Sequence, residues 1–315
     1  MRMVALNDGN AIPAFGLGTW KSLKNAVYAA VKEALRIGYT HVDAAWIYQN
    51  ESEVGKGIGE SIAEGVIARE DLFVTSKLWN SFHAPEDVEK GCKESLTALG
   101  LDYLDLYLMH WPVAFSPGTL GPKREDILSL SERPISETFE AMVALKEKGL
   151  VKSVGVSNFS ASKLEKLIRE TGVVPAMNQV ELHPYNPQTE LVDYCKNKGI
   201  QLTAYSPLGS GDRPESMKAK DEPPLLENET VKAVADDEGV SAAQLLIAWG
   251  LDRGTVVIPK STNAGRIAEN LAAAQHKLSA AARTALNEIE ISFRYVSPES
   301  WFIEGVTYDG ESFWQ

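Results

Sequence analysis

The chain has 315 residues, 44% of them hydrophobic and 23% charged, and its formal net charge is -12 at pH 7. This composition is that of a globular protein, and the length fits one large domain or two medium ones. The excess of acidic residues argues against nucleic acid or an anionic membrane as the main partner. No apolar run approaches the length of a membrane span, so we expect no membrane segment.

The N-terminus and the cysteines indicate the compartment. Residues 1–10 lack the pattern of a signal peptide and turn at Asp8-Gly9 instead. The two cysteines, Cys92 and Cys195, do not have the spacing of a metal motif. Because unpaired cysteines favour a reducing compartment, we expect a cytoplasmic protein without a bound metal.

Short β-prone runs alternate with helical runs along the chain. Residues 3–6 and 11–14 flank Asp8-Gly9 and predict a small β-hairpin. Strands are then predicted at 15–18, 41–44, 72–76, 104–109, 154–157, 178–182, 201–205 and 255–258. Helices are predicted at 24–37, 51–63, 85–99, 136–148, 160–171, 188–198 and 228–237, and two more follow the last strand at 263–274 and 280–290.

The segment 85–99 illustrates a predicted helix. Pro85 suits a first helical turn, and Gly100 suits the position after a last turn. Apolar residues recur on one face at Val88, Cys92, Leu96 and Leu99. This spacing predicts a helix with one buried face.

Eight strand-then-helix units imply a parallel sheet, and eight is the number that closes into a barrel. We therefore predict an α/β fold, a (β/α)8 TIM barrel with an N-terminal β-hairpin. A single domain is expected over residues 1–315, with residues 290–315 as a long C-terminal substrate loop.

The alternative fold is an open doubly wound sheet with a glycine-rich dinucleotide fingerprint. Gly16-Leu-Gly18 comes near that fingerprint but lacks its third glycine. Gly55-Lys-Gly57-Ile-Gly59 lies within a helical pattern and not directly after a strand. Both glycine runs are better explained by close backbone packing.

Three connections are longer than the rest: residues 112–134, 207–227 and the tail after Glu290. In a barrel the first two lie on the carboxyl face, where barrel enzymes keep their sites. The tail carries seven aromatic residues, namely Phe293, Tyr295, Trp301, Phe302, Tyr308, Phe313 and Trp314. It is predicted to form either a lid with an apolar lining or a cover over the barrel wall.

Polar residues stand at the ends of three consecutive predicted strands. These are Asp43, Lys77 and His110, and Tyr48 lies in the loop after the first of them. A lysine ammonium lowers the pKa of a nearby phenol, and an aspartate keeps that ammonium charged. The pattern predicts a tyrosine that gives up a proton near neutral pH, beside a histidine that orients a substrate oxygen. A structural ion pair and a Schiff-base role for Lys77 are the alternatives.

Eight motifs are spread over the chain: Gly16-Leu-Gly-Thr-Trp20, Val42-Asp-Ala-Ala-Trp-Ile-Tyr-Gln-Asn-Glu51, Thr75-Ser-Lys-Leu-Trp79, Leu108-Met-His-Trp-Pro112, Gly155-Val-Ser-Asn-Phe159, Asn178-Gln-Val-Glu-Leu-His183, Ala204-Tyr-Ser-Pro-Leu-Gly209 and Ile258-Pro-Lys-Ser261. With these motifs the chain resembles an aldo-keto reductase over essentially its whole length. The resemblance implies an NADPH-dependent (β/α)8 barrel enzyme. It also implies a catalytic tetrad of Asp43, Tyr48, Lys77 and His110, with Tyr48 as the general acid.

The resemblance implies a set of cofactor-binding residues. Ser157, Asn158 and Gln179 would hydrogen-bond the nicotinamide carboxamide, and Tyr205 would stack on its ring. Further contacts would come from Thr19, Trp20 and Asp43. The pyrophosphate would follow Ser206, Pro207, Leu208, Gly209 and Ser210, and the adenine would be reached by Glu269 and Asn270.

A basic cluster supports a phosphorylated cofactor independently. Lys260, Ser261, Thr262 and Arg266 follow the eighth strand at the start of a helix. Two cations, hydroxyl donors and helix-terminal N–H groups suit a phosphomonoester, here the 2'-phosphate of NADP. A solvated helix end is the alternative. NADPH or NADP+ is therefore the expected cofactor, with NADH as a weaker one.

Large apolar side chains are expected around the substrate. They are Trp20, Ile47, Trp79, Trp111 and Trp301, with Tyr48 and His110 at the reacting oxygen. Such a lining favours aldehydes with hydrophobic or modestly polar side chains. Trp46 lies two residues before Tyr48, and we expect its bulk to narrow or to reshape the entrance.

The predicted function is reduction of aldehydes, and of some ketones, to alcohols by hydride transfer from NADPH. The expected partner is a small-molecule carbonyl compound, and the protein is expected to be a monomer. Two alternatives remain: a non-catalytic NADPH-binding relative on the same fold, and a Lys77 Schiff-base lyase.

Overall fold

The computed structural model describes residues 1–23, 25–308, 310 and 312–314. Within them, eight parallel strands form one sheet in the order β10-β9-β8-β7-β6-β5-β4-β3. Their bounds are β3 Leu17–Gly18, β4 His41–Asp43, β5 Phe73–Leu78, β6 Leu104–Met109, β7 Val151–Ser157, β8 Met177–Glu181, β9 Gln201–Tyr205 and β10 Val256–Val257. Parallel bridges join Phe15 to Val257 and Gly18 to Lys260, so the two ends of the sheet meet. The predicted barrel is confirmed.

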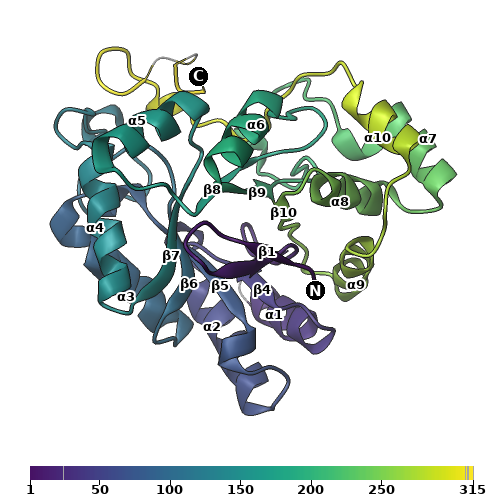
Figure 1. The fold of residues 1–315 in the computed structure, drawn as a ribbon, viewed down its shortest axis with the longest axis horizontal. Helices are drawn as coiled ribbons and strands as arrows, with labels where there is room; N and C mark the ends of the chain where they lie inside the picture. The colour runs from purple at the N-terminus through teal and green to yellow at the C-terminus, as the bar shows by residue number, and fades with distance from the viewer. Residues whose placement is uncertain (24, 309, 311, 315) are drawn as a thin grey trace.

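Helices surround this sheet (Figure 1). Their bounds are α1 Ala26–Arg36, α2 Glu51–Ala63, α3 Pro85–Leu99, α4 Ile135–Glu147, α5 Ala161–Thr171, α6 Thr189–Lys198, α7 Glu229–Glu238, α8 Ala242–Asp252, α9 Ala264–Ala273 and α10 Ala280–Asn287. Consecutive helices from α1 to α6 contact each other around the outside of the strands, and α6 also contacts β9. Most predicted elements have these positions within one to three residues.

Helix α3 has the bounds that the sequence predicts. Pro85 occupies its first turn, and Gly100 ends it with a φ of 66°, a left-handed conformation that glycine adopts without strain. The predicted apolar face is buried at Val88, Cys92, Leu96 and Leu99. Periodicity identified this helix because only one of its faces meets the barrel.

Helix α8 was not among the predicted helices. Ser241 and Gln244 form a capping box at its start. Every residue from Leu245 to Leu251 is buried, because α7 and α9 also pack against this helix. A helix that is apolar on all sides has no polar face and hence no amphipathic period. The periodicity of the sequence therefore did not predict α8.

The predicted N-terminal hairpin is present as β1 (Met3–Ala5) and β2 (Ala11–Pro13), paired antiparallel. Its Leu6 and Ile12 side chains join a buried cluster with Phe73, Met177 and Val256, which begin or nearly begin their strands. The hairpin therefore covers the amino end of the barrel. The carboxyl ends of the strands lie at the opposite end.

The glycine runs pack against neighbouring backbone, as predicted. A Cβ on Gly18 would lie 2.7 Å from the carbonyl oxygen of Ile258, where the barrel closes. A Cβ on Gly55 would lie 2.4 Å from the carbonyl oxygen of Leu99, where α2 crosses the end of α3. These glycines allow two backbone segments to approach closely. They do not form a phosphate-binding loop.

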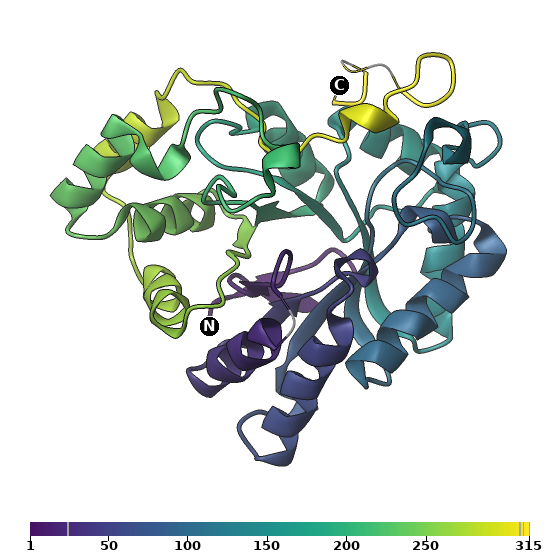
Figure 2. The ribbon, with the colours of Figure 1, turned by 180° about the vertical axis from the view of Figure 1, so that it is seen from behind.

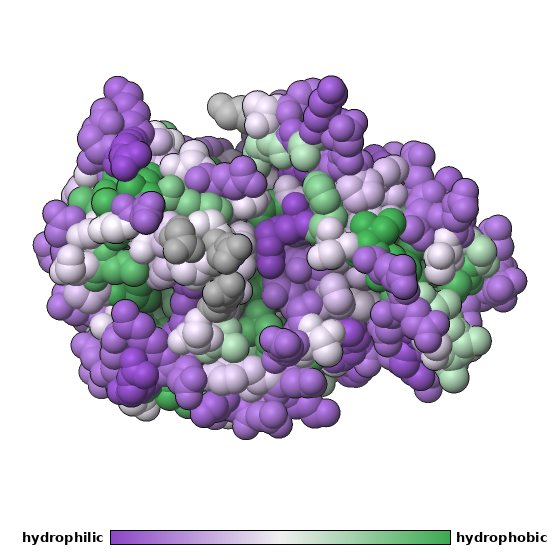
Figure 3. All heavy atoms as spheres, turned by 90° about the horizontal axis from the view of Figure 1, so that it is seen from above, coloured by the Kyte–Doolittle hydropathy of each residue, from purple (hydrophilic) through white to green (hydrophobic). Residues whose placement is uncertain are grey.

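After α10 the chain continues as an irregular tail that contains the short 3-10 helix η7 (Glu299–Trp301). The tail runs beside α5, as both ribbon views show (Figure 1, Figure 2). Lys163 of α5 fastens it by donating hydrogen bonds of 2.7 Å to the carbonyl oxygens of Ser312 and Phe313. The view from above shows a mostly hydrophilic surface with separate apolar patches (Figure 3). Among the described residues no helix could cross a membrane.

Candidate functional site

Lys77 lies at the centre of the candidate site, near the carboxyl end of β5. Its side chain is 0% exposed, yet all three hydrogens of its ammonium have an acceptor. The Nζ atom lies 2.6 Å from Asp43 Oδ1, 2.9 Å from the Ala44 carbonyl oxygen and 3.3 Å from the Tyr48 hydroxyl. Burial lowers the pKa of Lys77, and the hydrogen-bonded carboxylate of Asp43 opposes that shift. The predicted group of Asp43, Tyr48 and Lys77 is thus brought together.

Asp43 ends β4 and is held from two sides. Its Oδ2 accepts a 2.7 Å hydrogen bond from Gln179 Nε2, and its carbonyl oxygen accepts one of 2.8 Å from Thr19 Oγ1. The carboxylate is only 2% exposed. Asp43 therefore has a fixed orientation, in which one oxygen faces Lys77 and the other faces the end of β8.

Tyr48 lies on a single turn, η1 (Trp46–Tyr48), between β4 and α2. Burial raises the pKa of its phenol well above the ordinary value, and the carboxylates of Asp43 and Glu51 add to the shift. The prediction that Lys77 would make Tyr48 acidic near neutral pH is therefore wrong. Spacing placed the ammonium near the phenol, but it could not show how deeply the phenol is buried or that two carboxylates act on it. Tyr48 holds its proton at neutral pH, as a proton donor must.

His110 follows β6 and faces Tyr48, with ring centroids 5.8 Å apart in an edge-to-face arrangement. Burial lowers the pKa of His110 well below the ordinary value, and Lys77 and His83 add to the shift by charge repulsion. The imidazole is therefore neutral at pH 7. A neutral ring with one N–H can donate a hydrogen bond to a substrate oxygen beside Tyr48.

The residues expected around the nicotinamide lie together at the ends of β7, β8 and β9. Asn158 donates to the His110 carbonyl oxygen at 2.9 Å and accepts from the Tyr205 hydroxyl at 2.8 Å. Ser157 donates to the Gln179 carbonyl oxygen at 2.7 Å. Amide, hydroxyl and ring groups thus form a continuous rim next to Asp43.

The loop after β9 turns sharply at three positions with positive φ, Ser206 at 48°, Gly209 at 82° and Ser210 at 52°. Ser206 and Ser210 are also joined by a 3.2 Å hydrogen bond between their hydroxyl groups. Pro207 and Leu208 complete this turn. The segment expected to follow the pyrophosphate is therefore folded back on itself beside the strand ends.

Lys21 and Asp212 belong to this region and were missed by sequence reasoning. Lys21 donates to Ser210 Oγ at 2.8 Å and pairs with Asp212, which also pairs with Lys260 at 3.0 Å. Burial raises the pKa of Asp212, but hydrogen bonds from Lys21 and Lys260 outweigh it and lower the pKa to about 2. No sequence spacing connects these residues, because they come from three different loops.

The rest of the predicted phosphate and adenine group lies around the start of α9. Asn263 caps the helix by accepting from the Arg266 N–H at 3.0 Å, and the Arg266 side chain is exposed. Glu269 pairs with the hydroxyl of Ser241, and Asn270 is buried. Ser261 and Thr262 precede the cap. Lys260 and Arg266 thus lie near a helix N-terminus, as predicted.

Aromatic rings surround Tyr48 and His110. The ring centroid of Trp20 lies 6.5 Å from that of Tyr48, and the ring centroid of Trp79 lies 5.4 Å from that of His110. Trp301 of the tail packs edge-to-face on Trp79 at 5.9 Å, on Trp111 at 5.5 Å and on Phe115 at 5.0 Å. Ile47 is half-buried on η1. The tail therefore lies over the predicted apolar side chains at the strand ends, which favours the lid over a simple cover of the barrel wall.

The base of the tail is held by Glu181, which sequence reasoning also missed. Its fully buried carboxylate accepts hydrogen bonds from the Tyr295 and Val296 N–H groups at 2.7 and 2.8 Å, and it lies 2.8 Å from His183 Nε2. Next to it, the guanidinium of Arg294 stacks 3.6 Å from the ring centre of Trp314. The motif that contains Glu181 was recognised, but not the tail contact.

Known proteins match the whole chain. The model of the Aldo/keto reductase family matches residues 14–291. An aldo/keto reductase of Synechocystis sp. is 43% identical over 100% of this chain and 96% of its own length. Aldo-keto reductase family 1 member A1 of Rattus norvegicus is 44% identical over 98% of this chain and 93% of its own length.

Two further proteins extend the comparison. The D/L-glyceraldehyde reductase of Hypocrea jecorina is 48% identical over 91% of this chain and 87% of its own length. The solved structure of the aldose reductase from Schistosoma japonicum has a TM-score of 0.87 and 37% identity, covering 96% of each chain. With the barrel, the motifs and these matches in agreement, the chain belongs to the aldo/keto reductase family.

Proposed function

We propose that this oxidoreductase reduces aldehydes, and some ketones, to alcohols with NADPH, and that Tyr48 is the general acid. The observation that carries the proposal is the buried ammonium of Lys77, 3.3 Å from the Tyr48 hydroxyl and bonded to Asp43. His110 faces the same hydroxyl. A carbonyl oxygen between Tyr48 and His110 would meet two donors at the position where negative charge develops.

NADPH, when bound, supplies the hydride that reduces the carbonyl carbon. The described residues fit such a cofactor. Asn158 and Gln179 present amides next to Asp43, and Lys260 with Arg266 offers two cations near a helix N-terminus. The rim of β7, β8 and β9 would hold the nicotinamide end, and the loops after β9 and β10 would hold the phosphates.

Each residue of the site would have a separate task. Tyr48 would give its proton to the substrate oxygen, and the Lys77 ammonium would stabilise the phenolate that remains. Asp43 would keep that ammonium charged in a buried place. His110 would orient the oxygen, and the aromatic side chains would exclude water from it.

The Schiff-base alternative for Lys77 is disfavoured by its surroundings. A lysine that attacks a carbonyl must be reachable and must have a free lone pair. The Lys77 side chain is 0% exposed and donates to three acceptors. After treatment with an aldehyde and sodium borohydride, peptide mapping should therefore find Lys77 unmodified, whatever happens at exposed lysines.

Tyr48→Phe tests the proposal directly. Loss of the phenol should lower kcat for an aromatic aldehyde by at least about 100-fold, because general acid catalysis contributes at least that much. NADPH affinity, measured by quenching of tryptophan fluorescence, should be unchanged. Wild-type turnover in the variant would overturn the proposal. NADPH binding without turnover in the wild type would indicate a non-catalytic relative instead.

Two buried cysteines support a proposal for the cell compartment. Burial raises the pKa of Cys92 and Cys195 to about 12, so both thiols resist deprotonation and oxidation. Two buried free thiols fit a reducing compartment, and we propose the cytoplasm.

The substrate class is supported by two of the similar proteins. One is a D/L-glyceraldehyde reductase and the other an aldose reductase, and both names indicate small polar aldehydes, which we propose among the substrates.

A further inference from the structure

Trp46 lies on η1 with Tyr48 but faces away from the predicted pocket. Its indole Nε1 donates a 2.9 Å hydrogen bond to Glu94 Oε2 on α3. Its ring packs edge-to-face on Phe82 of η3 (Asn80–Phe82), with centroids 5.0 Å apart. The expectation that Trp46 would narrow or reshape the entrance is therefore wrong, because its bulk lies against the outer helix.

The turn that carries Tyr48 is held at both ends by hydrogen bonds of the flanking residues. Before it, the Ala44 carbonyl oxygen accepts from Lys77 at 2.9 Å, and after it Asn50 donates to the carbonyl oxygens of Thr19 at 3.0 Å and Ser22 at 3.3 Å. None of the three residues of η1 is fully buried, and the element is one turn long. The Tyr48 N–H donates to Ala45 within the same segment, and Gln49 at the end of the turn has a left-handed φ of 54°. Contacts with other elements are made to α3 and β5. Between these flanking residues, the Trp46 side chain is the contact that ties η1 itself to α3 by a hydrogen bond.

Both partners of Trp46 belong to the unit that carries Lys77. The chain runs from β5, which contains Lys77, through η3 with Phe82 into α3 with Glu94. Tyr48 belongs to the preceding unit, between β4 and α2. The hydrogen bond from Trp46 to Glu94 thus joins the two units at the point where the Tyr48 hydroxyl must stay 3.3 Å from Lys77 Nζ.

We propose that Glu94 and Trp46 are positioning residues, which hold the Tyr48 hydroxyl in register with Lys77. This inference rests on the proposed function, since it assigns a role for the reaction that Tyr48 would perform. A hydrogen bond to a carboxylate is directional and stronger than one between neutral groups, so it can fix the rotation of η1. Small displacements of a reacting group lower the rate without changing distant binding sites.

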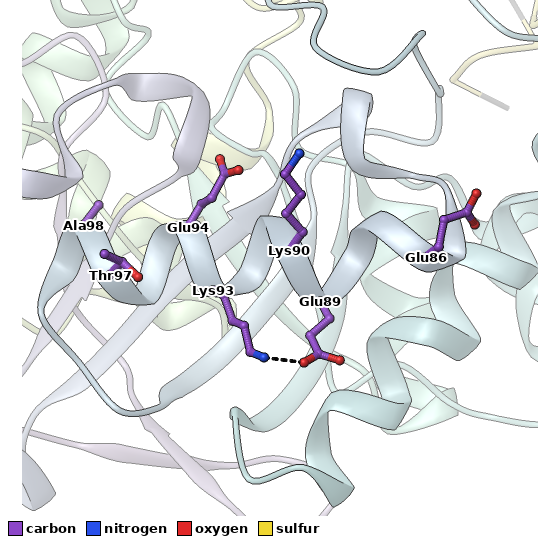
Figure 4. A pocket seen from close by; sticks show the side chains of 7 residues that line it. All are labelled: Glu86, Glu89, Lys90, Lys93, Glu94, Thr97 and Ala98. Carbon is purple, nitrogen blue, oxygen red and sulfur yellow. Dashed lines mark ion pairs between the residues drawn. The ribbon is translucent and has the colours of Figure 1, made fainter.

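Helix α3 also supplies a matched control. Glu94 and Glu89 lie among the residues of an open groove along this helix and project from opposite sides of it (Figure 4). Glu89 pairs with Lys93 at 2.6 Å and does not approach η1. Replacing either glutamate by alanine removes one carboxylate from the same helix. Only the change at Glu94 removes the acceptor of Trp46.

The experiment compares four variants with wild type in NADPH-dependent reduction of an aldehyde. Glu94→Ala and Trp46→Phe should each lower kcat and kcat/KM equally, by about tenfold, because the loss is confined to the transition state. Glu94→Gln should recover most of the rate, since its amide oxygen still accepts the indole hydrogen. Glu89→Ala should match wild type. NADPH affinity should be the same in all variants.

A double variant tests whether Glu94 and Trp46 act through one hydrogen bond. If Glu94 and Trp46 act through one bond, Glu94→Ala with Trp46→Phe should be no slower than the slower single variant. Losses that multiply, or a wild-type kcat in Glu94→Ala or in Trp46→Phe, would overturn the inference. Trp46→Phe keeps the ring on Phe82, so it remains a test if Glu94→Ala fails to fold. The results that would overturn the inference on Glu94 and Trp46 would not contradict the proposed function. Activity of Tyr48→Phe would contradict the proposed function.

Discussion

Tyr48 and Lys77 show how burial determines acid strength at the level of single residues. The phenol lies next to an ammonium, yet burial and two carboxylates raise its pKa. A phenol with a high pKa keeps its proton until an alkoxide forms on the substrate, and an alkoxide is basic enough to take it. In the proposed reaction, Lys77 would then contribute by stabilising the product phenolate more than by making the resting phenol acidic.

His110 leads to a prediction for the pH dependence of catalysis. Because the pKa of His110 lies well below its ordinary value, the ring stays neutral as the pH rises from 5.5 to 8. The rate of aldehyde reduction, measured as kcat/KM at saturating NADPH, should therefore show no titration centred near about pH 6.5, the usual value for histidine. A step of activity at that pH would mean that His110 is charged in part of the range.

Lys260 and Arg266 lead to a prediction for cofactor choice. Removing both cations with Lys260→Ala and Arg266→Ala should weaken NADPH binding by at least about thirtyfold, since each hydrogen bond to a charged group contributes on the order of 2 kcal/mol. NADH, which lacks the 2'-phosphate, should lose little. Dissociation constants from fluorescence quenching would measure both. Lys232→Ala, on the exposed side of α7, is the control for loss of positive charge.

Equal losses for NADPH and NADH would contradict the phosphate assignment. Lys260 also pairs with Asp212 at 3.0 Å, so its removal leaves that carboxylate with Lys21 as a partner. Arg266→Ala alone avoids this complication. It should still weaken NADPH more than NADH.

At the level of elements, the site is built from strand ends. Asp43, Lys77 and His110 lie at or near the ends of β4, β5 and β6, which pair in that order. Neighbouring parallel strands bring their carboxyl ends to one rim. The three residues therefore lie close enough to interact, although more than thirty positions separate each from the next in the sequence. For the same reason, the predicted strands were enough to locate them.

Two glycines of α2 give a prediction about helix packing. A Cβ on Gly55 would lie 2.4 Å from the Leu99 carbonyl oxygen, whereas a Cβ on Gly59 would meet nothing within 4 Å. Gly55→Ala should destabilise the fold by about 3 kcal/mol, because backbone of α3 would have to move. Gly59→Ala should stabilise it by up to about 1 kcal/mol, the helix preference of alanine over glycine.

Urea unfolding followed by circular dichroism would measure both free energies of unfolding. The two variants make the same chemical change in the same helix, so their difference isolates the contact between α2 and α3. If Gly55→Ala were as stable as Gly59→Ala, the close approach of these helices would be wrong.

At the level of the whole molecule, buried histidines should make the fold sensitive to acid. Burial lowers the pKa of His41 and of His83 to about 3. Their unfolded values lie near about 6.5, so the unfolded chain binds more protons between these two values. The stability that the two neutral histidines contribute is then fully present above about pH 6.5 and is lost as the pH falls toward their folded-state pKa. Each histidine should remove about 1.4 kcal/mol per pH unit in that window.

The free energy of unfolding, measured with urea at pH 7, 6 and 5, should follow this slope. His83→Leu removes one buried ring and should make the slope shallower by about 1.4 kcal/mol per pH unit below the unfolded pKa. An unchanged slope would mean that His83 is reached by water in the folded state. The chain's net charge of -12 becomes less negative over the same range, which acts in the other direction.

The barrel could be predicted because local patterns determine it. The period of apolar residues identified helix α3 to the residue, and the alternation of strands and helices predicted eight parallel strands. Helix α8 escaped because burial on every side leaves no period. Trp46 was assigned to the wrong surroundings because its neighbours in sequence, not its partners Glu94 and Phe82, were visible.

The sequence by itself determined the fold class, the family resemblance and the residues that meet at the strand ends, because periodicity, motifs and strand ends are local properties of the chain. Only the tertiary structure decided which atoms pair and how deeply they are buried. The three acceptors of Lys77, the raised pKa of Tyr48, and Asp212 between Lys21 and Lys260 depend on it. Hydrogen bonds and desolvation act between segments far apart in sequence, so spacing along the chain cannot express them.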